Sequence, residues 1–130
     1  MISVAAAIII QDGCVLCARK KAGLPLAGFW EFPGGKLEKG ETPEECLVRE
    51  LLEEFSVRCQ VGSFVAESVH DYGDKTIQLL GYYVTHIGGS FTLTDHDEII
   101  WLPVSELRSL KWAPADLPLV EALFRKHLPV

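Results

Sequence analysis

Residues 35–57 read GKLEKGETPEECLVRELLEEFSV, and this stretch carries the most specific pattern in the chain. Thr42, Pro43 and Glu45 combine a helix N-cap, a proline at the first helical position and a capping-box glutamate. The pattern predicts a helix from about residue 43 to about residue 55. At 3.6 residues per turn, its expected core face consists of Leu47, Val48, Leu51, Leu52 and Phe55.

The other side of this helix is unusually acidic. Glu50, Glu53 and Glu54 lie at offsets of three and four residues, where like charges cost about 0.2–0.5 kcal/mol per pair. They also lie at the C-terminal end, where the helix dipole prefers cations. One interpretation is a solvated acidic surface on which Arg49 screens Glu53. The other is a cluster that binds hard divalent cations, which take oxygen ligands and offset the repulsion. Helical spacing alone does not decide between them.

The flanking residues do distinguish the two interpretations. The stretch resembles the Nudix box, G-x5-E-x7-R-E-U-x-E-E-x-G-U, in which U is a bulky aliphatic residue. The matching residues are Gly35, Glu41, Arg49, Glu50, Leu51, Glu53, Glu54 and Val57. Ser56 departs from the pattern because the family has a glycine there, in a left-handed conformation that caps the helix. Serine at this position is expected to cost on the order of 1 kcal/mol of backbone strain.

The resemblance implies a divalent metal site, with Mg²⁺ as the cofactor and Mn²⁺ as a substitute. It implies that Glu50 and Glu54 are the principal metal ligands. Glu53 is then a third ligand or the base that orients water, and the backbone carbonyl of Gly35 is a further ligand. These residues are the predicted catalytic centre.

Four more residues receive supporting roles. The resemblance implies that Arg49 orients a carboxylate and that Glu41 supports the loop through hydrogen bonds. A triphosphate resists attack by water because its oxygens repel the nucleophile, so its charge must be neutralised. Lys36 and Arg19 are candidates for neutralising the phosphate charge that the metal leaves, and the alternative for each is a plain surface residue.

A second acidic cluster precedes the expected strand at residues 98–102. It consists of Asp95, Asp97 and Glu98, which by themselves are typical of a polar turn. In related hydrolases a carboxylate from this region joins the metal site. The resemblance therefore makes Glu98 the candidate for an additional ligand or base, with Asp95 and Asp97 in reserve.

Two further segments narrow the resemblance. Residues 30–36, WEFPGGK, look like the MutT-like branch of the family, which hydrolyses nucleoside triphosphates, including oxidised ones. Residues 113–123, APADLPLVEAL, resemble the bacterial CTP pyrophosphohydrolase group within that branch. The implied reaction converts a nucleoside triphosphate and water into a nucleoside monophosphate and pyrophosphate. CTP, dCTP or oxidised nucleotides are the expected substrates, so any effect on DNA repair would arise through the nucleotide pool.

Three residues are candidates for contacts with the base. Asp116 occupies the position where MutT-like enzymes place an amide or acid that reads the base, and it also suits the N-cap of the last helix. A carboxylate there would accept from an exocyclic amine such as that of cytosine, whereas an amide suits an oxidised guanine. Phe32 and Tyr72 are proposed to stack on the base, although aromatic residues beside a sheet are more often plain core.

The remaining pattern predicts one domain over residues 1–130. Residues 2–10 are continuously apolar, as in a strand covered on both faces, and Asp12-Gly13 predicts a hairpin into residues 14–19. Further strands are expected at 61–70, 76–86 and 98–102, a loop at 20–40 and a last helix at 117–127. A sheet with two flanking helices predicts an α/β/α sandwich, and the family resemblance implies that the sheet is mixed.

Composition limits the partners and the compartment. Twelve basic and eighteen acidic residues give a net charge of −6, which disfavours direct binding to nucleic acid. The apolar N-terminus is too short to span a bilayer, so we expect a cytoplasmic protein without membrane contact. Its expected partner is a small nucleotide, and its expected state is a monomer or weak dimer. The four cysteines are interpreted as ordinary thiols rather than a zinc site, because no second CxxC or His pair accompanies Cys14 and Cys17.

Two alternatives stay open. The box does not choose among Nudix substrates, so a nucleotide sugar, a dinucleoside polyphosphate, capped RNA or 8-oxo-dGTP itself could replace CTP. A module that binds nucleotides without hydrolysing them would keep the fold, but such modules have usually lost the carboxylates that Glu50, Glu53 and Glu54 supply here.

Overall fold

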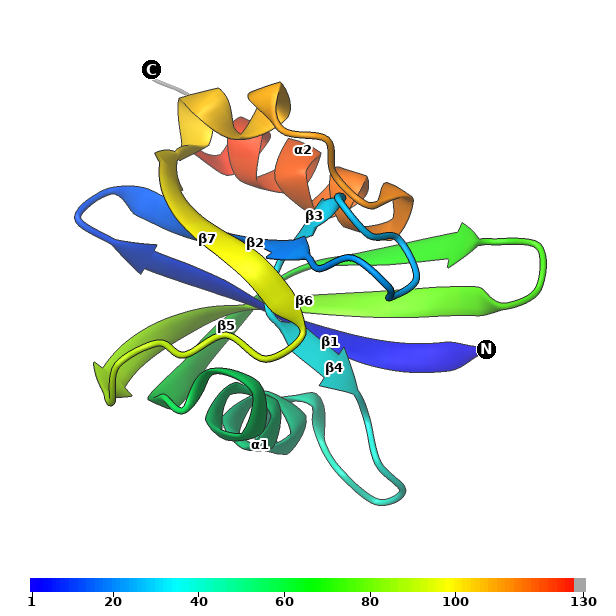
Figure 1. Ribbon diagram of the computed structural model, residues 1–130, viewed down its shortest axis with the longest axis horizontal. Helices are drawn as coiled ribbons and strands as arrows, with labels where there is room; N and C mark the ends of the chain where they lie inside the picture. Colours follow the sequence, from blue (N-terminus) through cyan, green and yellow to red (C-terminus); the bar gives the residue numbers. More distant parts are fainter. Residues whose placement is uncertain (128–130) are drawn as a thin grey trace.

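The computed structural model describes residues 1–127, within which seven strands form one mixed sheet with a helix on each face (Figure 1). The strands are β1 (Ile2–Gln11), β2 (Cys14–Lys20), β3 (Trp30–Glu31), β4 (Gly34–Lys36), β5 (Arg58–Asp71), β6 (Thr76–Gly88) and β7 (His96–Pro103). The helices are α1 (Pro43–Phe55) and α2 (Leu117–Lys126), and the 3-10 turns η1 (Val104–Ser109) and η2 (Pro114–Asp116) precede α2.

Strand β1 lies at the centre of the sheet. It pairs in parallel with β6 along one edge, while β4 and β2 pair with successive stretches of its other edge, both antiparallel. Beyond these neighbours, β5 pairs with β6, and both β3 and β7 pair with β2. Between the stretches of β1 that pair with β4 and with β2, the Ala7 amide donates to the Pro33 carbonyl at 2.7 Å.

Alternate side chains of β1 enter two separate hydrophobic layers. The layer under α1 includes Ala5, Ala7, Ile9, Leu47, Leu51 and Phe55. The layer under α2 includes Ala6, Ile8, Leu119, Val120 and Leu123. Two helices packed on opposite faces of one mixed sheet make an α/β/α sandwich, which confirms the predicted fold class.

Helix α1 begins and ends where its sequence predicts. Thr42 Oγ1 accepts from the Glu45 amide at 3.1 Å, and Glu45 Oε1 accepts from the Thr42 amide at 2.9 Å, so the capping box is complete. The predicted core face is wrong in two positions, because Val48 and Leu52 are 45% and 54% exposed. The fully buried residues of α1 follow the i, i+4 positions 47, 51 and 55. Val48 and Leu52 form the neighbouring row, which borders an open groove beside β5 and β6.

The segment from residue 20 to residue 40 is not entirely loop. It contains the short strands β3 and β4, which form only because β2 and β1 offer them free edges. The later strands exceed their predicted bounds by one to three residues at most ends. Both 3-10 turns were absent from the expected elements.

The four cysteines are free thiols, as expected. Burial raises the pKa of Cys17 to about 12, which keeps this thiol protonated and unreactive. Across residues 1–127, neither helix has the length and apolar character needed to cross a membrane.

Candidate active site

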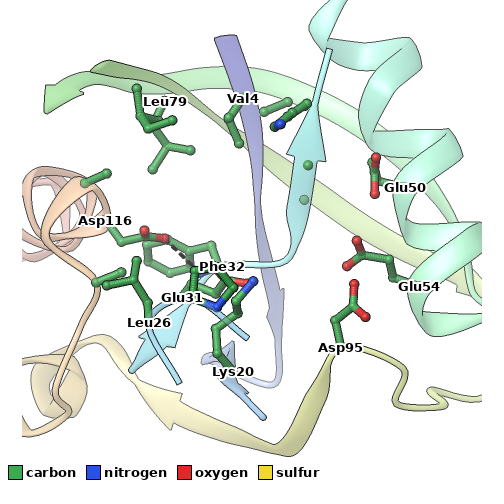
Figure 2. A pocket seen from close by; sticks show the side chains of 18 of the residues that line it. Val4, Lys20, Leu26, Glu31, Phe32, Glu50, Glu54, Leu79, Asp95 and Asp116 are labelled. Atoms are coloured by element: carbon green, nitrogen blue, oxygen red, sulfur yellow. Dashed lines mark hydrogen bonds between the residues drawn. The ribbon is translucent and has the colours of Figure 1, made fainter. Parts of the chain in front are cut away.

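A cavity of about 420 Å³ lies where β3, β4, α1 and the turn before α2 meet (Figure 2). One end carries the carboxylates of Glu50, Glu54 and Asp95. The other end is lined by Phe32, Tyr72 and Asp116. The cavity thus joins an acidic end, suited to cations, to an aromatic end, suited to a planar ring.

The acidic end brings Glu50 and Glu54 together from successive turns of α1, and Asp95 approaches them from the segment before β7 (Figure 2). Burial, followed by the hydrogen bond to Glu50 and the charges of Glu50, Asp95 and Glu31, raises the pKa of Glu54 to about 8. Near neutral pH, a bound proton or a cation must therefore compensate the negative charge of these carboxylates. Glu50 and Glu54 do not belong to a solvated acidic surface.

Gly35 lies against these carboxylates from β4. A Cβ atom at this position would overlap the Glu50 carboxyl group, so any larger residue would displace that carboxylate from its place against β4. The Gly35 carbonyl oxygen accepts a hydrogen bond from Cys46 Sγ at 3.4 Å.

The donor set suits a hard divalent cation. In the conformation that the structure describes for residues 1–127, no three acidic, imidazole or thiol side chains already form a metal cluster. The carboxylate and carbonyl oxygens are nevertheless the ligands that Mg²⁺ prefers. The raised pKa of Glu54 marks the negative charge that such an ion would neutralise. The residues therefore fit the ion that the sequence predicts.

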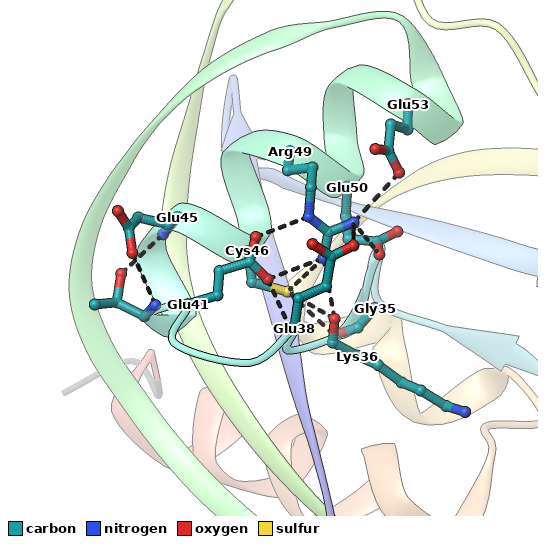
Figure 3. A network of polar contacts seen from close by, with 10 residues as sticks. Gly35, Lys36, Glu38, Glu41, Glu45, Cys46, Arg49, Glu50 and Glu53 are labelled. Carbon is teal, nitrogen blue, oxygen red and sulfur yellow. Dashed lines mark hydrogen bonds and ion pairs between the residues drawn. The ribbon is translucent and has the colours of Figure 1, made fainter.

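Arg49 is the centre of a polar network that joins the loop before α1 to the helix (Figure 3). Its Nε and Nη2 donate to the two oxygens of Glu41 at 2.7 and 2.9 Å. Its Nη1 donates to Glu50 Oε1 at 2.9 Å, and its Nη2 donates to the Lys36 carbonyl at 3.1 Å. Arg49 thus contacts both a cavity carboxylate and the loop, as its predicted role requires.

Glu41 carries the other half of this network. The hydrogen bonds from Arg49, together with one from the Glu38 amide, lower the pKa of Glu41 to about 2. Its side chain is 12% exposed, and the bidentate pair holds the loop against α1.

Glu53 points away from the cavity. Its side chain is 60% exposed and lies 3.3 Å from Arg49 Nη1, and it is absent from the described residues that line the cavity. Its role as a third ligand or as the base stays a prediction, and that role requires a different side-chain rotamer.

The acidic cluster before β7 is divided. Asp95 lines the cavity, whereas Asp97 and Glu98 pair with Arg19 at 2.7 and 3.2 Å. The cause is the register of the sheet, in which Arg19 on β2 lies opposite Glu98 on β7. Asp95, held in reserve by the sequence prediction, is therefore the carboxylate that the structure places at the site in place of Glu98.

The same register also keeps the Arg19 side chain out of the cavity. Arg19 is held by its two carboxylates and is not one of the described residues that line the cavity. Lys36 does line it, together with Lys20 and Lys75, and the role of Lys36 toward phosphate stays a prediction. These ammonium groups are the available partners for phosphate charge.

The aromatic end contains both predicted stacking residues. Phe32 is 3% exposed, and its ring centroid lies 4.7 Å from that of Trp112. Tyr72 accepts a hydrogen bond from the Ala115 amide at 3.0 Å through its hydroxyl group. Phe32 is part of the hydrophobic layer under α2, which confirms the core interpretation, and it also borders the cavity, where stacking on a base stays a prediction.

Asp116 also faces this end, but it does not cap α2. Its Oδ2 accepts from the Phe32 amide at 3.0 Å, and its side chain makes no capping hydrogen bond to α2. Asp116 stands at the predicted N-cap position of α2, but its side chain makes no capping bond because the chain enters α2 from η2 with Asp116 already in a helical conformation. Burial, and then the charge of Glu31, raise the pKa of Asp116 well above its usual range.

Besides Lys20 and Lys75, the sequence prediction missed two cavity residues that contact each other. Glu31 lines the cavity and lies 2.8 Å from the Nε2 atom of buried His96, which also lines it. Glu31 belongs to the WEFPGGK segment, which the sequence prediction used for the family resemblance without giving Glu31 a role in the site. His96 gave no local signal, because only the pairing of β2 with β7 brings it to the site.

Comparisons with known proteins identify relatives that match nearly the whole chain. The chain is 39% identical over 122 residues to the CTP pyrophosphohydrolase of Escherichia coli strain K12, an alignment that covers 94% of this chain and 90% of the relative. It is 30% identical over 115 residues to the 8-oxo-dGTP diphosphatase of the same strain, covering 88% and 89% of the two chains. The solution structure of the E. coli ORF135 protein matches with a TM-score of 0.87 at 38% identity, covering 100% of this chain and 94% of that one.

The family model described as the NUDIX domain matches residues 1–123, a range that contains all of α1 and all of the described residues that line the cavity. The box residues, the sandwich that carries them and the full-length relatives therefore lead to one family, and this chain belongs to the NUDIX hydrolases.

Proposed function

We propose that this chain is a magnesium-dependent nucleoside triphosphate pyrophosphohydrolase, with Mn²⁺ as a substitute cofactor. The observation that carries the proposal is one cavity that joins half-buried carboxylates to an aromatic end (Figure 2). A nucleotide bound along the cavity would place its phosphates at the carboxylates and its base between the aromatic residues. Membership of the family makes the chain a hydrolase of phosphoric anhydrides.

Glu50, Glu54 and the Gly35 carbonyl would hold the metal, with Asp95 as the additional carboxylate and Glu53 as the predicted third ligand. When bound, the ion neutralises phosphate oxygens and polarises water. The chain's own residues orient the reacting groups. Arg49 fixes the Glu50 carboxylate through a hydrogen bond of 2.9 Å, and the loop held by Glu41 keeps Gly35 against it. Lys36, Lys20 and Lys75 also line the cavity and would supply positive charge to a bound nucleotide.

In the reaction, the oxygen of water forms a bond to phosphorus, and the anhydride bond between the α and β phosphoryl groups breaks. One proton of the water passes to a carboxylate of the cluster. The products are a nucleoside monophosphate and pyrophosphate. Before a metal binds, burial and the neighbouring charges raise the pKa of Glu54 to about 8, so Glu54 is the carboxylate whose charge the ion would compensate most directly.

In this proposal Asp116 selects the base, and Phe32 and Tyr72 stack on it. The buried carboxyl group is anchored by the Phe32 amide at 3.0 Å, so its direction is fixed. A carboxylate accepts from the exocyclic amine of cytosine, which favours CTP or dCTP. Two relatives, named as a CTP pyrophosphohydrolase and an 8-oxo-dGTP diphosphatase, support this pair of substrate classes.

The decisive experiment incubates the protein and Mg²⁺ with a panel of nucleotides and identifies the products. The panel contains CTP, dCTP, 8-oxo-dGTP, a nucleotide sugar and a dinucleoside polyphosphate. We expect monophosphate and pyrophosphate from the triphosphates, with cytidine substrates preferred. Release of orthophosphate, or of two monophosphates, would overturn the assignment. Tight binding without any product would favour a non-catalytic module.

Asp116→Asn tests base reading separately from catalysis. An amide both donates and accepts, so we expect kcat/KM to shift from cytidine towards oxidised guanosine substrates. The measurement is the ratio of kcat/KM for dCTP and 8-oxo-dGTP in the variant and the wild type. An unchanged ratio would reduce Asp116 to a residue that anchors Phe32.

We further propose a cytoplasmic location, which the four free thiols support because cytosolic proteins keep their cysteines reduced. A monomer or weak dimer stays the expected state, to be measured by size-exclusion chromatography with light scattering.

A further inference from the structure

His96 lies at the start of β7 and is almost completely buried, with 4% of its surface exposed. Its ring stacks on Phe55 of α1, with ring centroids 5.2 Å apart and planes inclined by 21°. Its Nε2 lies 2.8 Å from Glu31 Oε2 on β3. Within residues 1–127, its Nδ1 is buried without a hydrogen-bond partner.

Packing alone does not account for an imidazole at this position. The stack on Phe55 asks only for a flat ring, which a phenylalanine would supply without leaving a buried nitrogen unsatisfied. What the imidazole adds is a hydrogen-bond donor toward Glu31. The function of the residue therefore depends on what Glu31 does.

Glu31 lies between the two ends of the cavity (Figure 2). Its side chain is 26% exposed, so it is held mostly within the protein while its carboxylate reaches the cavity. Its charge contributes to the upward pKa shifts of Glu54 at the acidic end and of Asp116 at the aromatic end. A nucleotide that spans these ends has its sugar at the level of Glu31.

We propose that His96 is a positioning residue that holds the Glu31 carboxylate toward the cavity, where Glu31 accepts a hydrogen bond from a sugar hydroxyl of the bound nucleotide. The assignment of a nucleotide rests on the proposed function above. A carboxylate accepts only, and a sugar hydroxyl is the donor that every nucleotide offers between its phosphates and its base. His96 also packs on the helix that carries Glu50 and Glu54, so it links the sugar contact to the same framework as the acidic end.

The first test compares His96→Phe with His96→Gln. Phenylalanine keeps the stack on Phe55 and removes the donor, so we expect a melting temperature no lower than that of the wild type and a kcat/KM reduced about tenfold. Glutamine restores an N–H donor near the position of Nε2, so it is expected to recover most of the lost activity. A His96→Phe variant that is as active as the wild type would overturn the proposal, and so would a glutamine variant that is no more active than the phenylalanine one.

The second test removes the sugar hydroxyl from the substrate. We expect the wild type to hydrolyse dCTP with a kcat/KM about tenfold higher than that of its 2′,3′-dideoxy analogue. In Glu31→Gln and in His96→Phe this ratio is expected to fall toward one, and in the double variant it should fall no further. A wild-type ratio of one, or variants that keep the wild-type ratio, would overturn the sugar contact.

Calorimetry with the same two nucleotides and Ca²⁺ separates this inference from the proposed function, because binding needs no turnover. A wild type that hydrolyses no nucleotide but binds dCTP about tenfold more tightly than the dideoxy analogue would support the contact while refuting the enzyme. Equal affinities would refute the contact. A Glu31→Gln variant with weakened Mn²⁺ binding in the absence of nucleotide would make Glu31 a metal ligand, which also overturns the proposal.

Discussion

Glu53 and Glu54 are sequence neighbours in different environments, and the difference shows what single residues contribute here. Glu54 faces the cavity with a pKa raised to about 8, whereas Glu53 is 60% exposed and pairs with Arg49. Helical spacing placed both on one acidic side, but only the packing of β4 and the Asp95 segment decides which carboxylate is enclosed. For the same reason, Glu31 and His96 had no counterpart in the sequence prediction.

Replacing these glutamates by glutamine tests the acidic end. We expect Glu54→Gln to lower turnover at least about a hundredfold with an unchanged circular dichroism spectrum, because it removes a charge that a metal needs. The same loss is predicted for Glu53→Gln if Glu53 is a ligand or the base. The matched control is Glu44→Gln, an exposed position in the first turn of α1. Losses below about threefold in both variants would remove the metal assignment.

At the scale of elements, α1 could be predicted to the residue because its signals are local. The capping box, the proline and the apolar residues lie within one stretch of chain; the caps are present as expected, and three of the five predicted core residues are buried. The short strands β3 and β4 could not be predicted, since they depend on edges provided by β2 and β1. The exposure of Val48 and Leu52 likewise depends on where the sheet ends.

The end of α1 offers a test of backbone strain. Ser56 adopts a left-handed conformation with a φ of 60°, as its place in the Nudix box predicts, and its hydroxyl lies 2.9 Å from that of Thr92. We expect Ser56→Gly to raise the free energy of unfolding by up to about 1 kcal/mol, measured by urea denaturation. Ser56→Ala is the control, because it loses the hydroxyl but keeps the strained Cβ. A glycine variant no more stable than the alanine one would contradict the argument.

The pair that joins the loop to α1 predicts a dependence of stability on pH. The pKa of Glu41 is lowered to about 2 in the folded protein, below its ordinary value in an unfolded chain of about 4.3. Its contribution is therefore complete above the unfolded pKa and is lost as the pH falls toward the folded one. In urea titrations between about pH 5 and pH 2, we expect Glu41→Gln to flatten the decline that the wild type shows. Equal slopes in the variant and the wild type would contradict this role.

At the scale of the whole molecule, the sandwich followed from the apolar stripes of two helices and one continuously apolar strand. The strand order did not, because the parallel pairing of β1 with β6 joins residues 2–9 to residues 77–84. The cavity depends on that order. Its wall combines residues from β1, α1 and η2, so no single segment of the sequence contains all of its lining residues.

Removing divalent metal should separate function from folding. The two hydrophobic layers contain no proposed ligand, so we expect treatment with EDTA to abolish turnover while the circular dichroism spectrum is retained. Adding Mg²⁺ or Mn²⁺ should restore activity and, with a nucleotide present, raise the melting temperature, because a ligand that binds only the folded state stabilises it. Turnover that survives exhaustive chelation would contradict a metal-dependent mechanism.

The double use of β1 has a consequence for how the protein denatures. Because its odd-numbered side chains belong to one layer and its even-numbered side chains to the other, neither helix can detach without exposing a strand that the opposite layer also needs. Melting should therefore be a single cooperative transition. A destabilising substitution beneath one helix should weaken the binding of the phosphates and of the base together.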